Sequence, residues 1–287
     1  MASTTSINNE LYSALVTQAQ FAAYENSIAR QLVTVFDAPL NTGKTLQVPV
    51  WAAVSATAEY NSGLTEGTAP SSLSTNTTSA VITLGEHIVY HQVTDLLRDS
   101  AYNDVFSQLG DMSGRAIAES MDTEVFSYFA PNAATTLSGN VGTDGGTVTT
   151  QTILQAAATL RSRKLTGPFY AVIHPGQAYA LKANLTATTS YSSISNVGNA
   201  VLDGFYIGQI AGVSIFESAL VPGNASNAYG AVFAPQALGH AMRGGIEMNT
   251  LYLPATRATD VVMKATAGAQ VLNTTFGVRV LGAKSIP

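Results

Sequence analysis

Residues 104–129, which read DVFSQLGDMSGRAIAESMDTEVFSYF, contain the clearest element of this sequence. One apolar row recurs every four residues: Ile117, Met121, Val125 and Phe129. A neighbouring row consists of Val105, Leu109, Met112 and Ala116. This spacing predicts an amphipathic helix over 103–130, capped by Asn103 or Asp104 and ended by Pro131. At a rise of ~1.5 Å per residue it would span roughly 40 Å, and Gly110 and Gly114 would permit close approach of another backbone.

Two stretches before this helix have the two-residue period of β-strands. Residues 45–60 begin TLQVPVW, and Pro49 lacks the N–H that a central strand needs, so this strand is expected at a sheet edge. Residues 80–93 (AVITLGEHIVYHQV) return as a second strand, and residues 61–79 form a polar tip rich in Ser and Thr. A lone hairpin is marginally stable in water. The projection therefore needs another surface to lie on.

The rest of the chain mixes helical and strand-like segments, which predicts an α+β fold. A modest helical stripe covers 7–24, an apolar strand is predicted over 28–36, and a helix over 150–164 is capped by Thr149 or Thr150. The other predicted elements are a short helix that begins at Pro175 and strands at 168–175, 208–217, 228–234 and within 251–282.

The composition of the 287 residues excludes several classes of protein. Charged residues make up only 11%, against about 25% in ordinary domains, and 25 Ser and 33 Thr replace them. Without cysteine there is no disulfide scaffold or thiolate metal site. A net charge of −5 argues against electrostatic nucleic-acid binding. A free monomer with so little charge would tend to self-associate, which suggests that other copies cover much of its surface.

The charges are segregated along the chain. Residues 1–124 hold 13 acidic and 4 basic residues, a net of −9, and residues 125–287 hold 5 acidic and 9 basic, a net of +4. This pattern fits either drift in surface composition or a front half that meets the back half of a neighbouring copy. The N-terminus has no signal-peptide pattern and no run is long enough to cross a bilayer, so we expect a cytosolic protein with no membrane contact.

Motifs that would carry chemistry are incomplete. NTGKT at 41–45 ends like a phosphate-binding loop, but Ala38 stands where the first glycine belongs and a strand follows instead of a helix. His87 and His91 have the spacing of zinc ligands without a third ligand, and structural roles are expected for them. His174 and His240 are lone histidines, for which we expect backbone partners.

No other group of residues forms a catalytic pattern. Acidic pairs such as Asp122 and Glu124 are expected to be solvated or interfacial on the long helix. There is no GxSxG elbow and no acid–base constellation. We therefore assign no catalytic, cofactor-binding or metal-binding residue and expect a protein that is not an enzyme.

The order of these elements resembles the HK-97-type major capsid protein of tailed bacteriophages over nearly the whole chain. Four segments carry the resemblance: TLQVPVWAAV…VITLGEHIVYHQVTDLLRDS, DVFSQLGDMSGRAIAESMDTEVFSYF, TILQAAATLRSRKLTGPFYAVIHPGQAYAL and GQIAGVSIFESALVPGNASNAYGAVFAPQAL.

The resemblance implies a division of the chain into regions. Residues 1–36 would be the N-arm, 37–92 the E-loop hairpin, 93–130 with 229–287 the peripheral (P) domain with its spine helix and C-terminal strands, and 131–228 the axial (A) domain. In that family, the arm and E-loop lie over adjacent subunits, and hexamers and pentamers close into an icosahedral shell around double-stranded DNA. The implied location is the virion, with assembly in the host bacterial cytoplasm.

Two departures from the family pattern bear on partners and strength. Only about 36 residues precede the E-loop, so the resemblance implies a separate scaffolding protein, beside a portal protein and an optional cement or decoration protein. Residues 45–163 contain no lysine, so we predict that E-loop lysines form no covalent cross-links. The alternative is an encapsulin-like nanocompartment shell, which shares the fold but houses an enzyme. A hydrolase or lectin-like surface protein would need a convergent polar site, which the sequence lacks.

Overall fold

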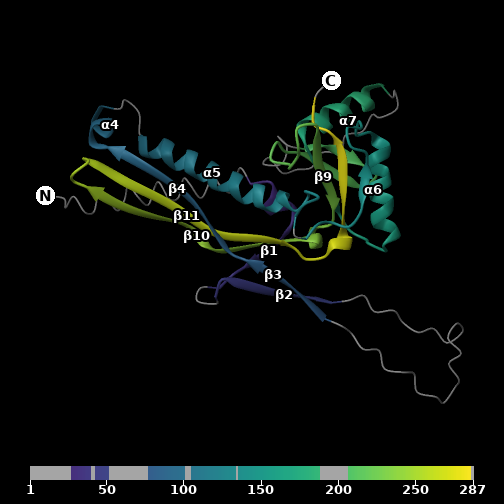
Figure 1. The fold of residues 1–287 in the computed structure, drawn as a ribbon, viewed down its shortest axis with the longest axis horizontal. Helices are drawn as coiled ribbons and strands as arrows, with labels where there is room; N and C mark the ends of the chain where they lie inside the picture. The colour runs from purple at the N-terminus through teal and green to yellow at the C-terminus, as the bar shows by residue number, and fades with distance from the viewer. Residues whose placement is uncertain are drawn as a thin grey trace, which may run out of the picture.

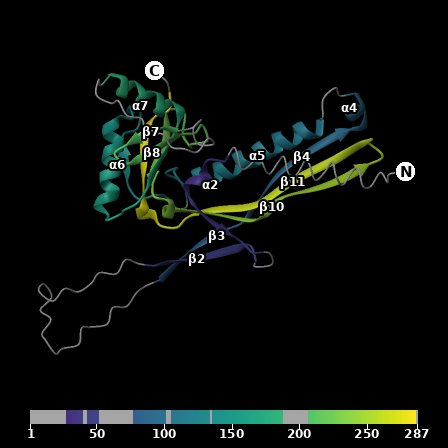
Figure 2. The ribbon, with the colours of Figure 1, turned by 180° about the vertical axis from the view of Figure 1, so that it is seen from behind.

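The computed structural model describes residues 27–39, 43–51, 77–100, 105–133, 135–187 and 206–285. A long four-stranded sheet lies beside a compact six-stranded sheet, and a two-stranded hairpin crosses the long sheet (Figure 1). The view from behind shows the same three parts, with helix α5 running along the long sheet (Figure 2). The fold is therefore α+β, as predicted.

The long sheet has the order β1 (Thr34–Asp37), β10 (Leu238–Leu253), β11 (Ala258–Val271) and β4 (Gly85–Thr94). β1 runs parallel to β10, and the other neighbours are antiparallel. β1 pairs only as far as Met242, whereas β10 continues to Leu253. The outer half of the sheet is therefore built from three strands in the described part of the chain.

Helix α5 (Val105–Ser127) packs on one face of the long sheet and follows the short helix α4 (Asp95–Ser100). Its first predicted row is confirmed, since Ile117, Met121, Val125 and Phe129 are all buried. At its 23 residues, α5 spans roughly 35 Å. The predicted cap at Asn103 or Asp104 lies outside the described residues.

The second predicted row of α5 is wrong at two of its four positions, Met112 and Ala116, whereas Leu109 is half-buried against the sheet. Met112 is 60% exposed and Ala116 is exposed, while Gly110, Ser113 and Gly114 are buried. Small side chains at these three positions let the helix approach the sheet closely, so the contact forms where apolar periodicity alone would not place it.

The predicted hairpin is confirmed in its stem. β2 (Thr45–Trp51) pairs antiparallel with β3 (Thr77–Thr83), and its tip lies outside the described residues. Its apolar face packs on the long sheet opposite α5, in a cluster with these members: Phe36, Ala38, Leu46, Val48, Ile82, Leu84, Ala241 and Leu272. The predicted returning strand is divided at Leu84, because β3 stays in the hairpin and β4 joins the long sheet.

Backbone crosses backbone where the hairpin leaves the long sheet. The Leu84 N–H donates to the Lys44 carbonyl at 2.9 Å. A Cβ atom built on Gly268 of β11 would lie 2.2 Å from the Thr83 carbonyl oxygen, so only glycine fits beneath this crossing.

The compact part is a six-stranded sheet with two helices on one face. Its strands, in order across the sheet, are β5 (Asn140–Gly142), β12 (Gly277–Ala283), β9 (Asn227–Phe233), β6 (Phe169–Ile173), β8 (Val213–Glu217) and β7 (Tyr206–Ile210). Helices α6 (Thr150–Ser162) and α7 (Pro175–Ala187) cover a face lined by Ile173, Val232 and Val280. Thr149 caps α6, as predicted.

The opposite face of the compact sheet joins it to the rest of the molecule. Phe216 and Phe233 pack there against Phe126 and Phe129 from the end of α5. The ring centroids of Phe129 and Phe233 are 5.6 Å apart. Two short 3-10 turns, η1 (Pro235–Ala237) and η2 (Thr274–Phe276), connect the two sheets. The two parts therefore share one apolar core.

Two predicted strands differ from the structure. Residues 28–36 form helix α2 (Ala29–Leu32) followed by β1, because Ala29 and Leu32 bury their side chains beside α5. Residues 208–217 form two antiparallel strands, β7 and β8, since Ala211 and Gly212 make a turn with φ of 53° and 79°. The helical stripe at 7–24 lies outside the described residues.

The predicted regions do not coincide with the sheets. Residues 229–287 were expected to form one region, but β9 and β12 lie in the compact sheet and β10 and β11 in the long sheet. Residues 85–92, expected in the hairpin, lie in the long sheet as β4. The chain crosses between the two sheets at η1 and again at η2, which a division into consecutive segments misses.

The crossing at Gly268 can be tested by a matched pair of substitutions. We expect Gly268→Ala to lower the free energy of unfolding by about 1–3 kcal/mol, because the new methyl group meets backbone that cannot move aside. Gly85→Ala is the control, since the nearest atom to a Cβ built there is the Ala267 carbonyl oxygen at 3.9 Å, an ordinary contact distance. Urea denaturation of both variants measures the difference. Equal midpoints would contradict the tight crossing.

Candidate assembly surfaces

A row of polar side chains fastens α5 to β4. His87 makes hydrogen bonds through Nδ1 to Ser120 Oγ at 2.7 Å and through Nε2 to Glu124 Oε2 at 3.1 Å. His91 Nε2 lies 3.0 Å from the Oγ of the buried Ser113. Both histidines thus have helix partners, which agrees with the structural roles predicted for them.

The chain of Ser120, His87 and Glu124 contains the residue types of a nucleophile, a base and an orienting acid. Acyl transfer also needs free N–H donors where the oxyanion develops. Ser120 lies well inside α5, where backbone N–H groups are used in helix hydrogen bonds. Glu124 is also committed, since its Oε1 accepts from the Ala269 N–H at 3.2 Å. The arrangement ties helix to sheet and offers no oxyanion site.

Metal-binding clusters and membrane-spanning helices are both absent from the described ranges. No group of three or more His, Asp or Glu side chains there is placed to hold a metal ion. None of the helices in those ranges combines the length and apolar character needed to span a bilayer.

The two lone histidines, His174 and His240, differ in their hydrogen bonds. His174 Nδ1 accepts from the Gly176 N–H at 3.1 Å, so the predicted backbone partner is present. His240 on β10 is buried and its Nδ1 has no hydrogen-bond partner, so the same prediction is wrong there. Burial, helped by the positive charge of Arg30, lowers the pKa of His240 to about 4, which keeps the ring neutral at pH 7.

The NTGKT segment does not form a phosphate site. Strand β2 begins at Thr45, so no helix N-terminus follows Lys44 to hold a phosphate. Gly43 has φ of 80° and its carbonyl accepts from the Arg243 guanidinium, which anchors the hairpin to β10. Residues 41 and 42 of the motif lie outside the described residues.

Asp122 is buried, contrary to the prediction that it is solvated or interfacial. Only 2% of it is exposed, and its carboxylate accepts from Ser27 Oγ at 2.7 Å and from the Ile28 N–H at 2.8 Å. Burial raises its pKa to about 6, against the opposing effect of these hydrogen bonds. The first described residues of the chain therefore rest on a buried carboxyl group of α5.

The face of the long sheet turned away from α5, here called the outer face, carries exposed apolar side chains. Ile88, Tyr90 and Leu251 are each more than half exposed on it. Polar pairs accompany them: the Tyr90 hydroxyl donates to Asp260 at 2.9 Å, and Lys264 pairs with Glu247 at 3.0 Å. Scattered apolar residues are normal, but a cluster on an uncovered sheet face marks an interaction surface.

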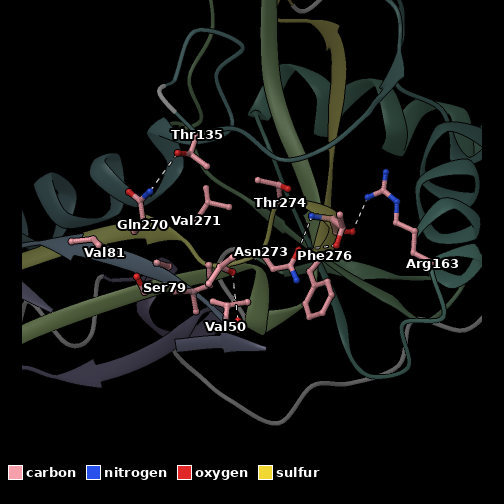
Figure 3. Close-up of a pocket in the computed structure, with 14 residues that line it drawn as sticks. Val50, Ser79, Val81, Thr135, Arg163, Gln270, Val271, Asn273, Thr274 and Phe276 are labelled. Carbon is pink, nitrogen blue, oxygen red and sulfur yellow. Dashed lines mark hydrogen bonds between the residues drawn. The ribbon is translucent and has the colours of Figure 1, made fainter. Parts of the chain in front are cut away.

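An open cavity of about 790 Å³ lies between the hairpin and the loop that follows β11 (Figure 3). Val50 and Ser79 line it on the hairpin side, and Gln270 and Asn273 on the other. Arg163 is the one charged residue of the lining, and its guanidinium donates to the carbonyl oxygens of residues 138 and 275. The cavity brings no acid–base pair together and is a groove beside the hairpin.

Solved capsid structures share this fold. The capsid of the cyanophage P-SCSP1u matches with 21% identity and a TM-score of 0.65, covering 88% of this chain and 87% of that chain. The capsid of Ralstonia phage GP4 matches with 11% identity and a TM-score of 0.68, covering 89% and 88%. The SrpI encapsulin of Synechococcus elongatus matches with 11% identity and a TM-score of 0.63, covering 87% and 85%.

Sequence comparison narrows the fold to a family. No curated protein sequence matches the chain. The family model described as phage capsid protein matches residues 77–284, which include the returning hairpin strand, α5, the compact sheet and every strand of the long sheet except β1. Because that match covers more than half of the sequence, the chain belongs to the phage capsid protein family.

Proposed function

We propose that this capsid protein forms hexamers and pentamers that close into the icosahedral head of a tailed phage around double-stranded DNA. The family match to residues 77–284 supports a shell protein. The observation that carries the assembly proposal is the uncovered outer face, because one subunit leaves Ile88, Tyr90 and Leu251 in water. Closed-shell packing would bury them.

We propose that the hairpin and the N-terminal arm of adjacent copies bind to this face and bury it. Within one subunit, the hairpin stem already packs on the outer face near Ala241, through Leu46, Val48 and Ile82. The exposed cluster continues the same face toward α4. Because the apolar face of each stem is already buried in its own subunit, the proposed contact uses the part of a neighbouring hairpin beyond its stem, or the neighbouring arm.

The proposed shell is held without covalent cross-links. In the described hairpin, Lys44 at its base is the sole lysine. Elsewhere Lys182 pairs with Glu217 and Lys264 with Glu247, each at 3.0 Å. Apolar burial, strand pairing and charge pairing between copies would then supply the strength.

Other partners follow from the proposed phage role. We propose a separate scaffolding protein, a portal protein and an optional cement or decoration protein, with assembly in the cytoplasm of a bacterial host. The acidic composition supports enclosure of DNA without specific binding, since few free cations are available to hold phosphates.

An encapsulin-like nanocompartment is the second candidate, favoured by the likeness to the SrpI encapsulin. The two candidates differ in what the particle holds. Particles purified from the native source should contain nuclease-protected double-stranded DNA if the phage role is right. A protein cargo and no DNA would establish the nanocompartment instead.

Assembly itself can be tested by expression of the full chain with its scaffold, followed by size-exclusion chromatography and negative-stain imaging. We expect capsomers or closed particles, because the outer face is apolar and weakly charged. A stable monodisperse monomer under these conditions would contradict a shell function.

The outer face can be tested at Ile88, which is 56% exposed. We expect Ile88→Glu to change the free energy of unfolding of the subunit, measured in urea, by no more than ~0.5 kcal/mol, as for other surface substitutions. The same variant should block particle formation, because a carboxylate would be desolvated in the contact. Ile88→Val keeps the apolar surface and is the control. Normal particles from both variants would show that the outer face stays free.

Cross-linking can be tested on assembled particles boiled in SDS. We expect a single band near the subunit mass of 29.8 kDa, since the described hairpin has no lysine beyond its base. A ladder of dimers and larger multiples that resists boiling and reductant would refute the proposal.

A further inference from the structure

Residues 27–32, which include helix α2, contact the α5 residues Asp122, Val125 and Phe126 in a small buried site, here called the seat of α2. Helix α2 starts directly after Ile28, and the Asp122 carboxylate accepts hydrogen bonds at its N-terminal end, from Ser27 Oγ and the Ile28 N–H. Ala29 and Leu32 are 1% exposed and pack beside Val125 and Phe126. The seat therefore combines an apolar contact with a carboxyl group that lies under the first turn.

Asp122 receives its hydrogen bonds from uncharged donors. A hydroxyl and backbone N–H groups of α2 are the partners that oppose its burial. The positive charge nearest in sequence, Arg30 on α2, directs one guanidinium nitrogen toward Met242 Sδ at 3.6 Å. A buried carboxylate with neutral donors is stabilised less than one with an ion-pair partner.

Four further charged or titratable groups lie on the elements next to the seat, and three of them, Arg30, Glu124 and His87, act on the pKa of the fourth, His240. Arg30 belongs to α2, Glu124 to α5, His87 to β4 and His240 to β10. Glu124 and His87 are bonded to each other, and His240 is neutral because it is buried. Asp122 and His240 are thus the two buried groups whose charge would change the fit of α2.

We propose that the seat of α2 on α5 is a proton-operated latch, in which a proton on Asp122 tightens the attachment of the N-terminal segment and its loss loosens it. With a proton, the carboxyl can donate to Ser27 Oγ while its other oxygen accepts from the Ile28 N–H. Without the proton, a buried negative charge remains beneath α2 with only neutral donors. The latch is a property of the subunit and does not depend on the proposed phage role.

The sign of the effect follows from linkage. Asp122 has a pKa of about 6 in the seat and would return toward 3.8 once exposed, so the closed seat binds the proton more tightly. Between pH 7 and pH 5 this favours the closed seat by about tenfold. His240 acts in the opposite direction, because its pKa of about 4 lies below the ordinary 6.5. The stability of the closed seat therefore depends only weakly on pH in total. The effect of Asp122 must be measured by comparing the natural chain with a variant that lacks its carboxyl group.

Hydrogen exchange of the full, unassembled chain separates the effect of Asp122 from that of His240. The readout is the protection factor of the backbone amides at 29–33, corrected for intrinsic exchange, in the natural chain and in Asp122→Asn. We expect the ratio of natural to variant protection to rise about tenfold from pH 7 to pH 5. The control is Glu119→Gln, an exposed acid on the same helix, for which the ratio should stay flat.

A direct titration of the natural chain tests the proposal even if the Asp122→Asn variant does not fold. In the natural chain, the ¹³C carboxyl resonance of Asp122 should titrate near pH 6. A pKa near 4 in the folded chain would overturn the latch. So would a protection ratio for Asp122→Asn that does not change between pH 5 and pH 7.

Discussion

The close contact between α5 and the long sheet is the constraint on which the rest of the molecule depends. Gly110, Ser113 and Gly114 remove the side chains that would hold the helix away from β4. Where larger residues resume, His87 and Glu124 bridge helix and sheet. The end of the same helix supplies Phe126 and Phe129 to the compact part. One element thus sets the distance to the sheet, the position of α2 and the junction between the two parts.

The low charge of the chain has a structural consequence at its surfaces. Several charged groups are used inside the subunit: Arg163 holds loop carbonyls, Glu124 holds a strand, and Asp122 holds α2. The outer face presents Ile88, Tyr90 and Leu251 beside charged groups, of which Lys264 and Glu247 pair with each other and Asp260 accepts from Tyr90. Contacts between such faces avoid most of the cost of desolvating unpaired ions. This chemistry suits a subunit that must join many copies of itself.

The sequence predicted best what local spacing controls. The hairpin stem, α5 and α6 follow directly from periodicity and capping residues. The missed features depend on contacts between distant residues. Small residues face the sheet at 110–114 because β4 approaches there. Helix α2 forms in place of a strand because Ile28 donates a hydrogen bond to Asp122, which lies 94 residues further along the chain. The sequence does contain a signal for the burial of Asp122, since it lies between Met121 and Val125 on the buried side of the helix.

For a related reason, the sequence does not reveal where the chain passes between the two sheets. Strands 227–233 and 277–283 pair with each other although β10 and β11 intervene. No composition change marks the passages between the sheets at η1 and η2. Glycines that permit a close backbone crossing, such as Gly268 beneath the hairpin, have the same identity as glycines in turns. Their role is visible only once the Thr83 carbonyl is placed above Gly268. Register and crossing are long-range properties, which a single sequence encodes weakly.

The hairpin and α2 meet the same short part of the long sheet from opposite faces. Ala241 contacts the hairpin cluster, and its neighbour Met242 contacts α5 and receives the Arg30 guanidinium. A shift of the hairpin would therefore reach the seat of α2 through one stretch of β10. Beyond that stretch the register of β10 slips between Arg243 and Glu247, and Gly244 has φ of 65°. Because a bulge bends and twists a strand locally, the direction of the exposed outer half of the sheet is set at this irregularity, whereas the proximal half is held by the hairpin on one face and by α5 and α2 on the other.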